Sequence, residues 1–148
     1  HQFVYSLKLK PTLINLENLF FEMYIVDAFL GNFDRHRANW GFLKKNNKYS
    51  LAPIFDNGSS LFPQMIDENE MKLIISNEDE INKRVYTFPT SQIKLHNKKY
   101  SYFEVISSLE FLECNKALIK IYNRINLKNI FALINDINIS DIQNFIKQ

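Results

Sequence analysis

Residues 34–58 read DRHRANWGFLKKNNKYSLAPIFDNG and place two acidic residues, Asp34 and Asp56, near the two ends of one continuous segment. Between them, the segments 39–43 and 49–55, which are rich in apolar residues, flank the polar turn sequence KKNNK. Two such segments around a polar turn are typical of a β-hairpin. The sequence therefore predicts a short hairpin with one acidic loop before it and a second acidic loop, rich in turn-forming residues, after it.

The segment before this stretch has helical periodicity. Apolar side chains recur every three or four residues from Leu16 to Leu30, which predicts an amphipathic helix. Asn15 suits the N-cap of this helix, and Gly31 suits the position just after its last turn. The helix would therefore lead the chain directly into the loop that contains Asp34.

The rest of the chain is mostly helical in pattern. Residues 1–13 begin with alternating apolar and polar side chains, which predicts a short strand or an extended arm. We expect a helix or an ordered loop over 64–84 and a second short hairpin over 85–100. Helical spacing returns after Ser101 and continues to the end, where Ser140 caps a last short helix. The predicted fold is mainly α (α+β), a helical domain with one or two short β-hairpins.

The composition is that of one globular domain. With 148 residues, of which 46% are hydrophobic and 23% are charged, the chain is long enough for one core and too short for two comfortable ones. We therefore interpret residues 1–148 as a single domain. The chain begins at His1 without an initiator Met, so we expect it to be a piece of a longer protein.

Charge and cysteine content narrow the class of function. The net charge of +2 is small and the Lys and Arg residues are spread out, so direct nucleic-acid binding is not expected. Glu22 and Asp27 interrupt the best apolar run, and no signal peptide is visible, so no membrane span is expected. The single Cys114 permits no internal disulfide and fits a reducing cytoplasm.

The polar residues of the central stretch match the needs of phosphoryl transfer. That reaction needs a carboxylate that takes the proton of the attacking hydroxyl, and oxygen ligands that hold Mg²⁺ against the phosphates of ATP. Kinases carry the base and one metal ligand on a single loop, as an Asp followed five positions later by an Asn. Asp34 and Asn39 have this spacing (39 − 34 = 5), and Asp56 follows the predicted hairpin, where a second metal ligand is needed.

A purely structural interpretation is the alternative. Asp, Asn and Gly are common in turns, so Asp34 alone could cap a turn and Asn57-Gly58 alone could form a bend. The combination is more specific, because a helix end, the Asp–Asn pair, a hairpin and a second Asp follow one another in the order that a kinase requires. We therefore favour the kinase interpretation.

The same residues resemble the C-terminal lobe of HipA-like serine/threonine kinases, the bacterial toxin kinases. The family pattern is Gly-Asn-x-Asp-x-His-x-x-Asn followed by a Leu-Ala-Pro strand and an Asp, and this chain contains GNFDRHRAN and LAPIFD. The Asp-Arg-His sequence also resembles the catalytic loop of phosphoinositide kinases, which share the broader fold. The matching positions are Gly31, Asn32, Asp34, His36, Asn39, Leu51, Ala52, Pro53 and Asp56.

The resemblance implies a role for each matching polar residue. Asp34 would be the catalytic base, and His36 would orient it, contact the transferred phosphate or make a structural hydrogen bond. Asn39 and Asp56 would bind Mg²⁺, with ATP as the phosphate donor, and Asn32 would shape the loop. The resemblance further implies a protein substrate, such as a translation factor or an aminoacyl-tRNA synthetase, and restraint by a DNA-binding, HipB-like antitoxin.

The chain departs from the kinase pattern in one large respect. Kinases cover the phosphates with a Gly-rich loop and grip them with a lysine on a strand of the N-lobe. This chain has only three glycines, none of them in a Gly-rich loop, and nothing before Asp34 is long enough to form an N-lobe. We therefore expect that the N-lobe is absent from this chain and that the chain is inactive without it.

Two rival functions remain open. A phosphoinositide or small-molecule kinase of the same fold would use a basic cluster near the site, and five basic residues are close to Asp34 in sequence. A non-catalytic orphan C-lobe would act as a binding module and would show no Mg²⁺-dependent nucleotide binding. The five basic residues are Arg35, Arg37, Lys44, Lys45 and Lys48.

Overall fold

The structure is a computed structural model, and it describes residues 16–46, 48–65, 67–92, 94 and 97–136. The strand predicted over the first 13 residues, the predicted N-cap at Asn15 and the last helix predicted at Ser140 lie outside these residues. In chain order the elements are α2 (Leu16–Leu30), β1 (Phe42–Lys45), β2 (Lys48–Leu51), α3 (Glu68–Ile75), α4 (Glu78–Asn82), the π-helix η2 (Lys83–Thr87), α5 (Tyr102–Ser107), α6 (Leu112–Tyr122) and α7 (Leu127–Asp136).

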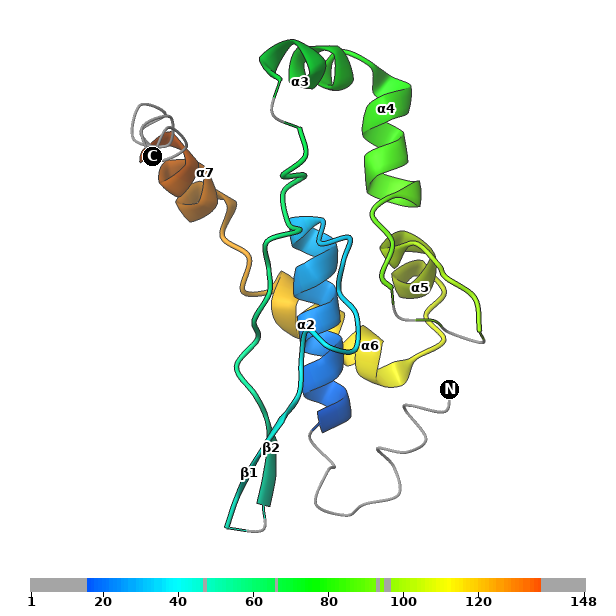
Figure 1. The fold of residues 1–148 in the computed structure, drawn as a ribbon. Helices are drawn as coiled ribbons and strands as arrows, with labels where there is room; N and C mark the ends of the chain where they lie inside the picture. Colours follow the sequence, from blue (N-terminus) through cyan, green and yellow to red (C-terminus); the bar gives the residue numbers. More distant parts are fainter. Residues whose placement is uncertain (1–15, 47, 66, 93, 95–96, 137–148) are drawn as a thin grey trace.

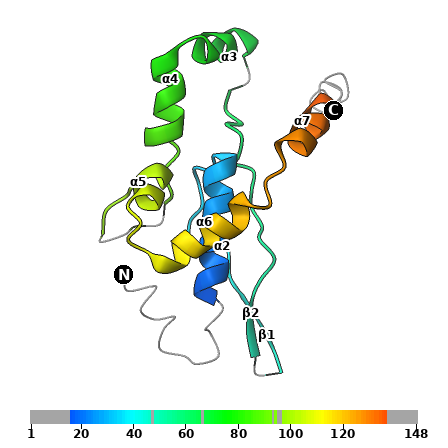
Figure 2. The ribbon, with the colours of Figure 1, turned by 180° about the vertical axis from the view of Figure 1, so that it is seen from behind.

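Helix α2 is the centre of the fold. It stands in the middle of the molecule, and α6 crosses it on the face seen in Figure 2 (Figures 1 and 2). The predicted helix is confirmed, but the expected one-sided amphipathic pattern is wrong, because consecutive residues Phe20 and Phe21 and the run from Met23 to Ile25 are all buried. Such a helix is covered on several sides, so the chain folds around it. The core consists of Phe20, Phe21, Met23, Tyr24, Ile25, Tyr102, Val105, Cys114 and Ala117.

Gly31 ends α2, as the sequence predicts. Its φ of +67° lies in the left-handed region, where a side chain is strained. A Cβ at this position would lie 3.3 Å from the ring of Phe62. Glycine therefore lets the chain turn sharply out of the helix while the loop after the hairpin packs closely against the turn.

The predicted hairpin is confirmed, but its strands are displaced along the sequence. β1 pairs with β2 in antiparallel register, with Phe42 opposite Leu51. The sequence predicted the strands over 39–43 and 49–55, so the first strand begins later and the second ends earlier than expected. The residues at both open ends of the hairpin belong to loops instead.

A buried arginine accounts for this difference. The backbone carbonyls of Asn39 and Phe55 both accept hydrogen bonds from Nη1 of Arg35, at 2.8 and 2.7 Å. A carbonyl that is used in this way is directed toward the arginine rather than into a strand ladder. Near Asn39 and Phe55 the backbone therefore forms loops, because its carbonyls bond to Arg35 and not to a neighbouring strand.

The second predicted hairpin, over 85–100, is wrong. Its first residues belong to η2, which continues the helical path of α4, and Pro89 then supplies no N–H for a ladder. Among the described residues of this stretch, strand-like pairing is limited to isolated bridges, one that joins Thr90 to Ser101 and one at Lys98. Residues 83–87 are helical instead, and this conformation is stabilised by Tyr86 of η2, whose ring packs on Phe103 of α5 with 4.7 Å between the ring centroids.

The expected helix or ordered loop over 64–84 is confirmed as α3 and α4. Asp67 caps α3 and Asn77 caps α4, each accepting a backbone N–H of the first turn. We refer to α3, α4 and η2 together as the arm. Figure 1 shows the arm rising from α5 and arching away from α2. The overall fold, mainly helical with one antiparallel hairpin, agrees with the predicted class.

Among the described residues, none of the helices has the combination of length and apolar character that crossing a bilayer requires.

Candidate active site

Two loops, one on each side of the hairpin, lie beside each other and form the candidate site. The first loop runs from α2 to β1, and the second follows β2. The N–H of Phe33 donates to the carbonyl of Ser59 (3.3 Å), and the N–H of Leu61 donates to the carbonyl of Leu30 (2.8 Å). These bonds bring the loop that contains Asp34 next to the loop that contains Asp56.

The side chain of Arg35 connects the two loops. It is fully buried, and its guanidinium makes five hydrogen bonds. Nε and Nη2 donate to the two carboxylate oxygens of Asp27, at 2.7 and 2.9 Å. Nη1 donates to the carbonyls of Asn39 and Phe55, and Nη2 also donates to Oδ1 of Asn57 at 2.6 Å. A guanidinium has five N–H donors, so every donor of Arg35 has a partner.

A second polar network shapes the first loop. Asn32 is fully buried, and its Nδ2 donates to Oδ1 of Asp27 at 2.9 Å. Its Oδ1 accepts from the N–H of Asp34 at 3.2 Å, and its carbonyl accepts from the hydroxyl of Tyr102 at 2.8 Å. Asn32, two residues before the candidate base, is therefore tied both to α2 and to α5. This arrangement agrees with the loop-shaping part that the resemblance implies for Asn32.

Burial keeps two tyrosine hydroxyls protonated. Desolvation raises the pKa of Tyr102 and the pKa of Tyr24 well above their usual value of 10. The hydroxyl of Tyr102 consequently remains a hydrogen-bond donor to Asn32 throughout the physiological pH range. The contact between α5 and the first loop is thus insensitive to pH near neutrality.

Asp34 and His36 lie at the surface of the first loop. Their side chains are 45% and 41% exposed, and Oδ2 of Asp34 lies 4.0 Å from Nε2 of His36. Nδ1 of His36 accepts from the N–H of Ala38 at 3.2 Å, so the neutral imidazole carries its proton on Nε2, the nitrogen nearer to the carboxylate. The carboxylate of Asp34 is open to an incoming hydroxyl and has an imidazole beside it.

Asn39 and Asp56 lie on different loops and differ in exposure. Asn39 is 3% exposed, and its Nδ2 donates to the carbonyl of Asp34 at 3.0 Å, which leaves Oδ1 on the opposite side of the amide. Asp56 is exposed and has a φ of +58°, a left-handed conformation that Asp tolerates better than most residues. Arg35 binds both neighbours of Asp56, the carbonyl of Phe55 and the side chain of Asn57.

The chemistry of these two side chains fits Mg²⁺. Magnesium prefers hard oxygen ligands and is commonly held by one or two protein groups together with phosphates and water. Asp56 offers an exposed carboxylate, and Asn39 offers an amide oxygen whose orientation is fixed through its Nδ2. Within the described part of the chain, no three or more His, Cys, Asp or Glu side chains gather in a way that could hold a metal.

The structure brings the loops of Asp34, Asn39 and Asp56 together around one guanidinium, and it leaves Asp34 and Asp56 accessible. Backbone hydrogen bonds such as that from Phe33 to Ser59 also join the two loops. The roles of base and metal ligand stay predictions.

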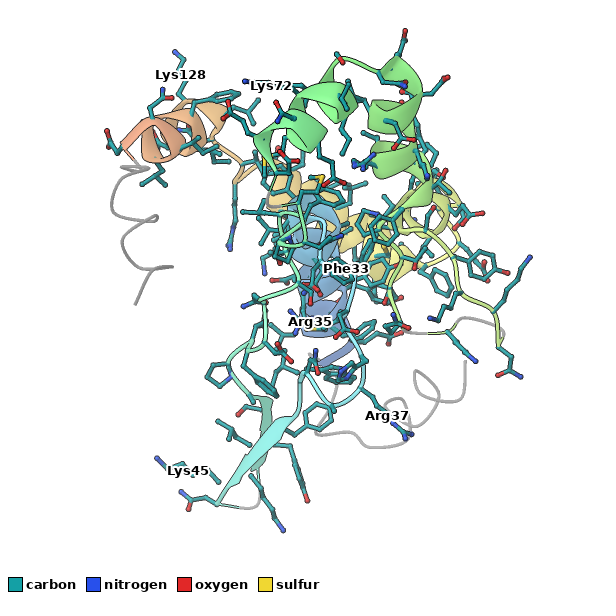
Figure 3. All side chains as sticks on the ribbon, turned by 45° about the horizontal axis from the view of Figure 1, so that its top comes forward. Phe33, Arg35, Arg37, Lys45, Lys72 and Lys128 are labelled. Carbon is teal, nitrogen blue, oxygen red and sulfur yellow. The ribbon has the colours of Figure 1, made fainter. Side chains whose placement is uncertain are left out.

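Sequence reasoning missed the central part played by Arg35 and Asp27. Arg35 is one of the five basic residues that left a phosphoinositide-headgroup cluster open, and its charge, buried against Asp27, removes it from such a cluster. Figure 3 shows Arg35 beside α2, whereas Arg37 points away from the body and Lys45 lies at the far end of the hairpin. A signal was present, because an aspartate in the middle of an apolar helix requires a buried partner.

Comparison with solved structures assigns the fold to a class. The chain matches the kinase-like C-lobe of a bacterial kinase, the proinflammatory kinase CtkA from Helicobacter pylori, with a TM-score of 0.79 and 39% sequence identity. The match covers 89% of this chain and 50% of the solved chain.

The sequence leads to the same relative. The chain is 43% identical over 124 residues to the serine/threonine-protein kinase CtkA of Helicobacter pylori strain J99, a match that covers 82% of this chain and 38% of the relative. The chain is therefore homologous to part of a serine/threonine kinase, and it spans less than half the length of the curated relative. No protein-family model matches the chain. The relationship to HipA-like and phosphoinositide kinases stays a prediction from the motif.

Proposed function

We propose that this chain is the catalytic C-terminal part of a serine/threonine protein kinase that transfers the γ-phosphate of ATP to a protein hydroxyl in the presence of Mg²⁺. The observation that carries the proposal is the guanidinium of Arg35, which binds the residues on both sides of Asp56 and the carbonyl of Asn39. The candidate base and the two candidate metal ligands are thereby held on adjacent loops. The 43% identity to a serine/threonine kinase gives independent support for this class of reaction.

In the proposed reaction Asp34 is the base. A serine or threonine hydroxyl of the substrate approaches its exposed carboxylate and gives up its proton as the hydroxyl oxygen bonds to the γ-phosphorus. The bond between that phosphorus and the oxygen of ADP breaks in the same displacement. His36, whose Nε2 lies 4.0 Å from the carboxylate, orients Asp34 or contacts the transferred phosphate.

Asn39 and Asp56 are the residues that would hold Mg²⁺. When bound, the ion would neutralise charge on the phosphates of ATP and align them for transfer. The chain's own contribution is to present the carboxylate of Asp56 on a loop whose backbone is bonded to the loop that contains Asp34. Arg35 provides this restraint through its bonds to the backbone at positions 39 and 55.

The cover over the nucleotide would come from outside this chain. The chain spans 38% of the curated relative and half of the solved one, so at least half of each relative lies beyond the matched region. We propose that an N-lobe, in the same polypeptide or in another chain, supplies the Gly-rich loop and the lysine that grip the phosphates. The chain alone would then have little activity.

The finer assignment to the HipA-like kinases rests on the motif. Gly31, Asn32, Asp34, His36 and Asn39 match the first part of the family pattern. On that basis we propose a cytoplasmic kinase of a toxin–antitoxin pair, with a HipB-like antitoxin and with a translation factor or aminoacyl-tRNA synthetase as the substrate. Loss of toxicity when the full-length kinase is expressed together with a DNA-binding partner would support this assignment, and an unchanged toxicity would remove it.

The decisive experiment uses the full-length protein and labelled ATP. Asp34→Ala should retain nucleotide and lose phosphate transfer, and Asp56→Ala should lose the Mg²⁺ dependence of nucleotide binding. Asp79→Ala is the matched control, since it removes an exposed aspartate from the arm. Unchanged transfer in Asp34→Ala would discard the assignment of the base.

The same assay separates the rival functions. Label on a protein supports the proposed kinase, whereas label on phosphoinositide vesicles supports a lipid kinase. The buried charge of Arg35 disfavours the lipid kinase, because this residue cannot contribute to a headgroup site. Absence of Mg²⁺-dependent nucleotide binding in the full-length protein would support a non-catalytic binding module.

A further inference from the structure

We infer that Arg35, held by Asp27, is a positioning residue that sets the metal affinity of the site by fixing the backbone on both sides of Asp56. This inference rests on the proposed function, because it concerns the way in which the candidate metal ligand is held. Arg35 does not reach the surface itself, since its side chain is fully buried. It acts on the site through the loops that it binds.

The geometry of the bonds favours this role over simple cross-linking. Arg35 does not bind the side chain of Asp56; it binds the carbonyl of Phe55 at 2.7 Å and Oδ1 of Asn57 at 2.6 Å. The residue between these two contacts is thus left with its carboxylate free and its backbone restrained. A ligand that is fixed in this way loses little conformational freedom when the metal binds.

The backbone conformation of Asp56 makes the restraint necessary. Its φ of +58° lies in a sparsely populated region for a residue with a side chain. Such conformations persist when surrounding contacts determine them. If the two flanking bonds were lost, the loop would sample more extended conformations, and the carboxylate of Asp56 would no longer be held in one position.

Asp27 provides the fixed end of this clamp. It is buried in α2, the central helix of the fold, and its two oxygens bind Nε and Nη2 of Arg35. The paired geometry orients the plane of the guanidinium, so that the remaining N–H groups point to defined places. The loop that contains Asp56 is thereby anchored to α2, the helix that contributes most of the core residues.

A lysine could not reproduce this arrangement. Its ammonium group has three donors on one nitrogen, whereas the partners of Arg35 surround a planar fork. Arg35→Lys keeps the charge that balances Asp27 but leaves some of the five acceptors without a donor. It therefore tests the positioning role more directly than a neutral replacement would.

Asn57 offers a milder test of the same clamp. It is exposed, so Asn57→Ala removes one hydrogen bond to Arg35 without opening a cavity in the core. The charge pair between Asp27 and Arg35 remains in place. A change in metal affinity in this variant cannot be attributed to unfolding if the melting temperature is unchanged.

The experiment measures Mn²⁺ binding in the presence of ADP by electron paramagnetic resonance, on the full-length protein, together with thermal unfolding. Loss of one charge-assisted hydrogen bond should weaken Mn²⁺ binding about two- to tenfold in Asn57→Ala, and by at least about tenfold in Arg35→Lys. Metal-free ADP binding should change little in both. Asp56→Ala serves as the reference for loss of a ligand, and Val105→Ala, a buried core residue, serves as the control for general destabilisation.

Each outcome separates the inference from the proposed function. Weaker Mn²⁺ binding in Asn57→Ala and Arg35→Lys, with unchanged binding in Val105→Ala, supports the clamp. If Asp56→Ala weakens binding but Asn57→Ala and Arg35→Lys do not, the clamp is overturned and the metal site stands. If Asp56→Ala leaves binding unchanged, the metal site itself is wrong. Equally weakened Mn²⁺ binding in Val105→Ala would show that Arg35 affects the metal only through general stability. If Arg35→Lys does not fold, Mn²⁺ binding by Asn57→Ala alone tests the clamp.

Discussion

The site loops and the arm follow each other in the chain, but they are held by different kinds of interaction. The site loops are tied to the buried carboxylate of Asp27 through Arg35 and Asn32. These hydrogen bonds join residues that are 5 to 20 positions apart in the sequence. In the arm, none of the helices has a buried residue. Among the described residues of the arm, ion pairs such as that between Arg84 and Glu80 join residues only three or four positions apart.

The difference shows how a small domain distributes rigidity. A buried guanidinium with five partners has one arrangement that satisfies every donor, so the loops around it are well defined. The arm is instead attached through η2, where Tyr86 packs on Phe103 and Arg84 lies 5.9 Å from the ring of Phe62. Segments with few buried contacts open more easily than the core. We expect catalysis to depend on the first region and stability to depend little on the second.

The largest effect is expected at the exposed end of the site loops. Asp34→Ala should lower the rate of phosphate transfer by about 10²–10⁴-fold, the contribution of a positioned general base. Its side chain is 45% exposed, so the free energy of unfolding should change little. Transfer to a protein substrate and urea unfolding of the full-length protein measure the two quantities. If the loss of unfolding free energy were as large as the rise in the activation free energy of transfer, Asp34 would be a structural residue of the loop and not the base.

The second effect concerns the buried charge that anchors the loops. Asp27→Ala leaves the guanidinium of Arg35 buried without its carboxylate, and breaking such a pair costs about 3–5 kcal/mol of unfolding free energy. Glu22→Ala is the matched control on the same helix, because Glu22 pairs with Lys120 near the surface at 2.6 Å, and such pairs contribute about 1 kcal/mol or less. The midpoint of urea unfolding checks both variants. Equal costs would contradict the view that the loops depend on a buried charge.

The sequence predicted local features well and long-range ones poorly. The end of α2 at Gly31 and the hairpin follow from residues close together in the chain, and both are confirmed. The strand limits were wrong because Arg35 takes the carbonyls of Asn39 and Phe55, residues 4 and 20 positions away from it. No periodicity reports such a contact.

The candidate site shows the same division. The spacing of Asp34 and Asn39 and the place of Asp56 after the hairpin could be read from the sequence, since the chemistry of phosphoryl transfer constrains them. The part played by Arg35 could not, because a basic residue in a polar loop is exposed in most proteins. Only the unexplained Asp27 in an apolar helix pointed to a buried partner, and helical periodicity gives no information about which basic residue that would be.

A third effect contrasts the core beneath the site with the surface. Burial raises the pKa of the Cys114 thiol from its usual 9.0 to about 11. In the unfolded chain the thiol loses its proton first as the pH rises, so its contribution to stability is complete below pH 9 and is lost as the pH approaches 11. The loss over these two pH units is about 2–3 kcal/mol.

Cys114→Ala removes this contribution, together with the part of the Tyr24 pKa shift that Cys114 causes. The variant keeps the buried hydroxyls of Tyr24 and Tyr102, whose raised pKa values add to the alkaline loss in both proteins. The difference between the two unfolding curves, measured from pH 8 to pH 11, should therefore shrink as the pH rises, since only the parent protein loses the thiol's contribution. A constant difference would show that the thiol is accessible to water.

The smallest effect is expected in the arm. Leu73 and Ile75 of α3 are 71% and 70% exposed, so Leu73→Ser and Ile75→Ser should each change the free energy of unfolding by no more than about 0.5 kcal/mol. Met23→Ala in α2, at a residue that is 1% exposed, should cost about 2–5 kcal/mol. Hydrogen exchange adds a second measurement, in which the amides of α3 exchange faster than those of α2 because fewer buried contacts hold them. Costs at Leu73 comparable to that at Met23 would show that another part of the full-length protein covers the arm, and the contrast between the two regions would then hold only for the residues described by the structure.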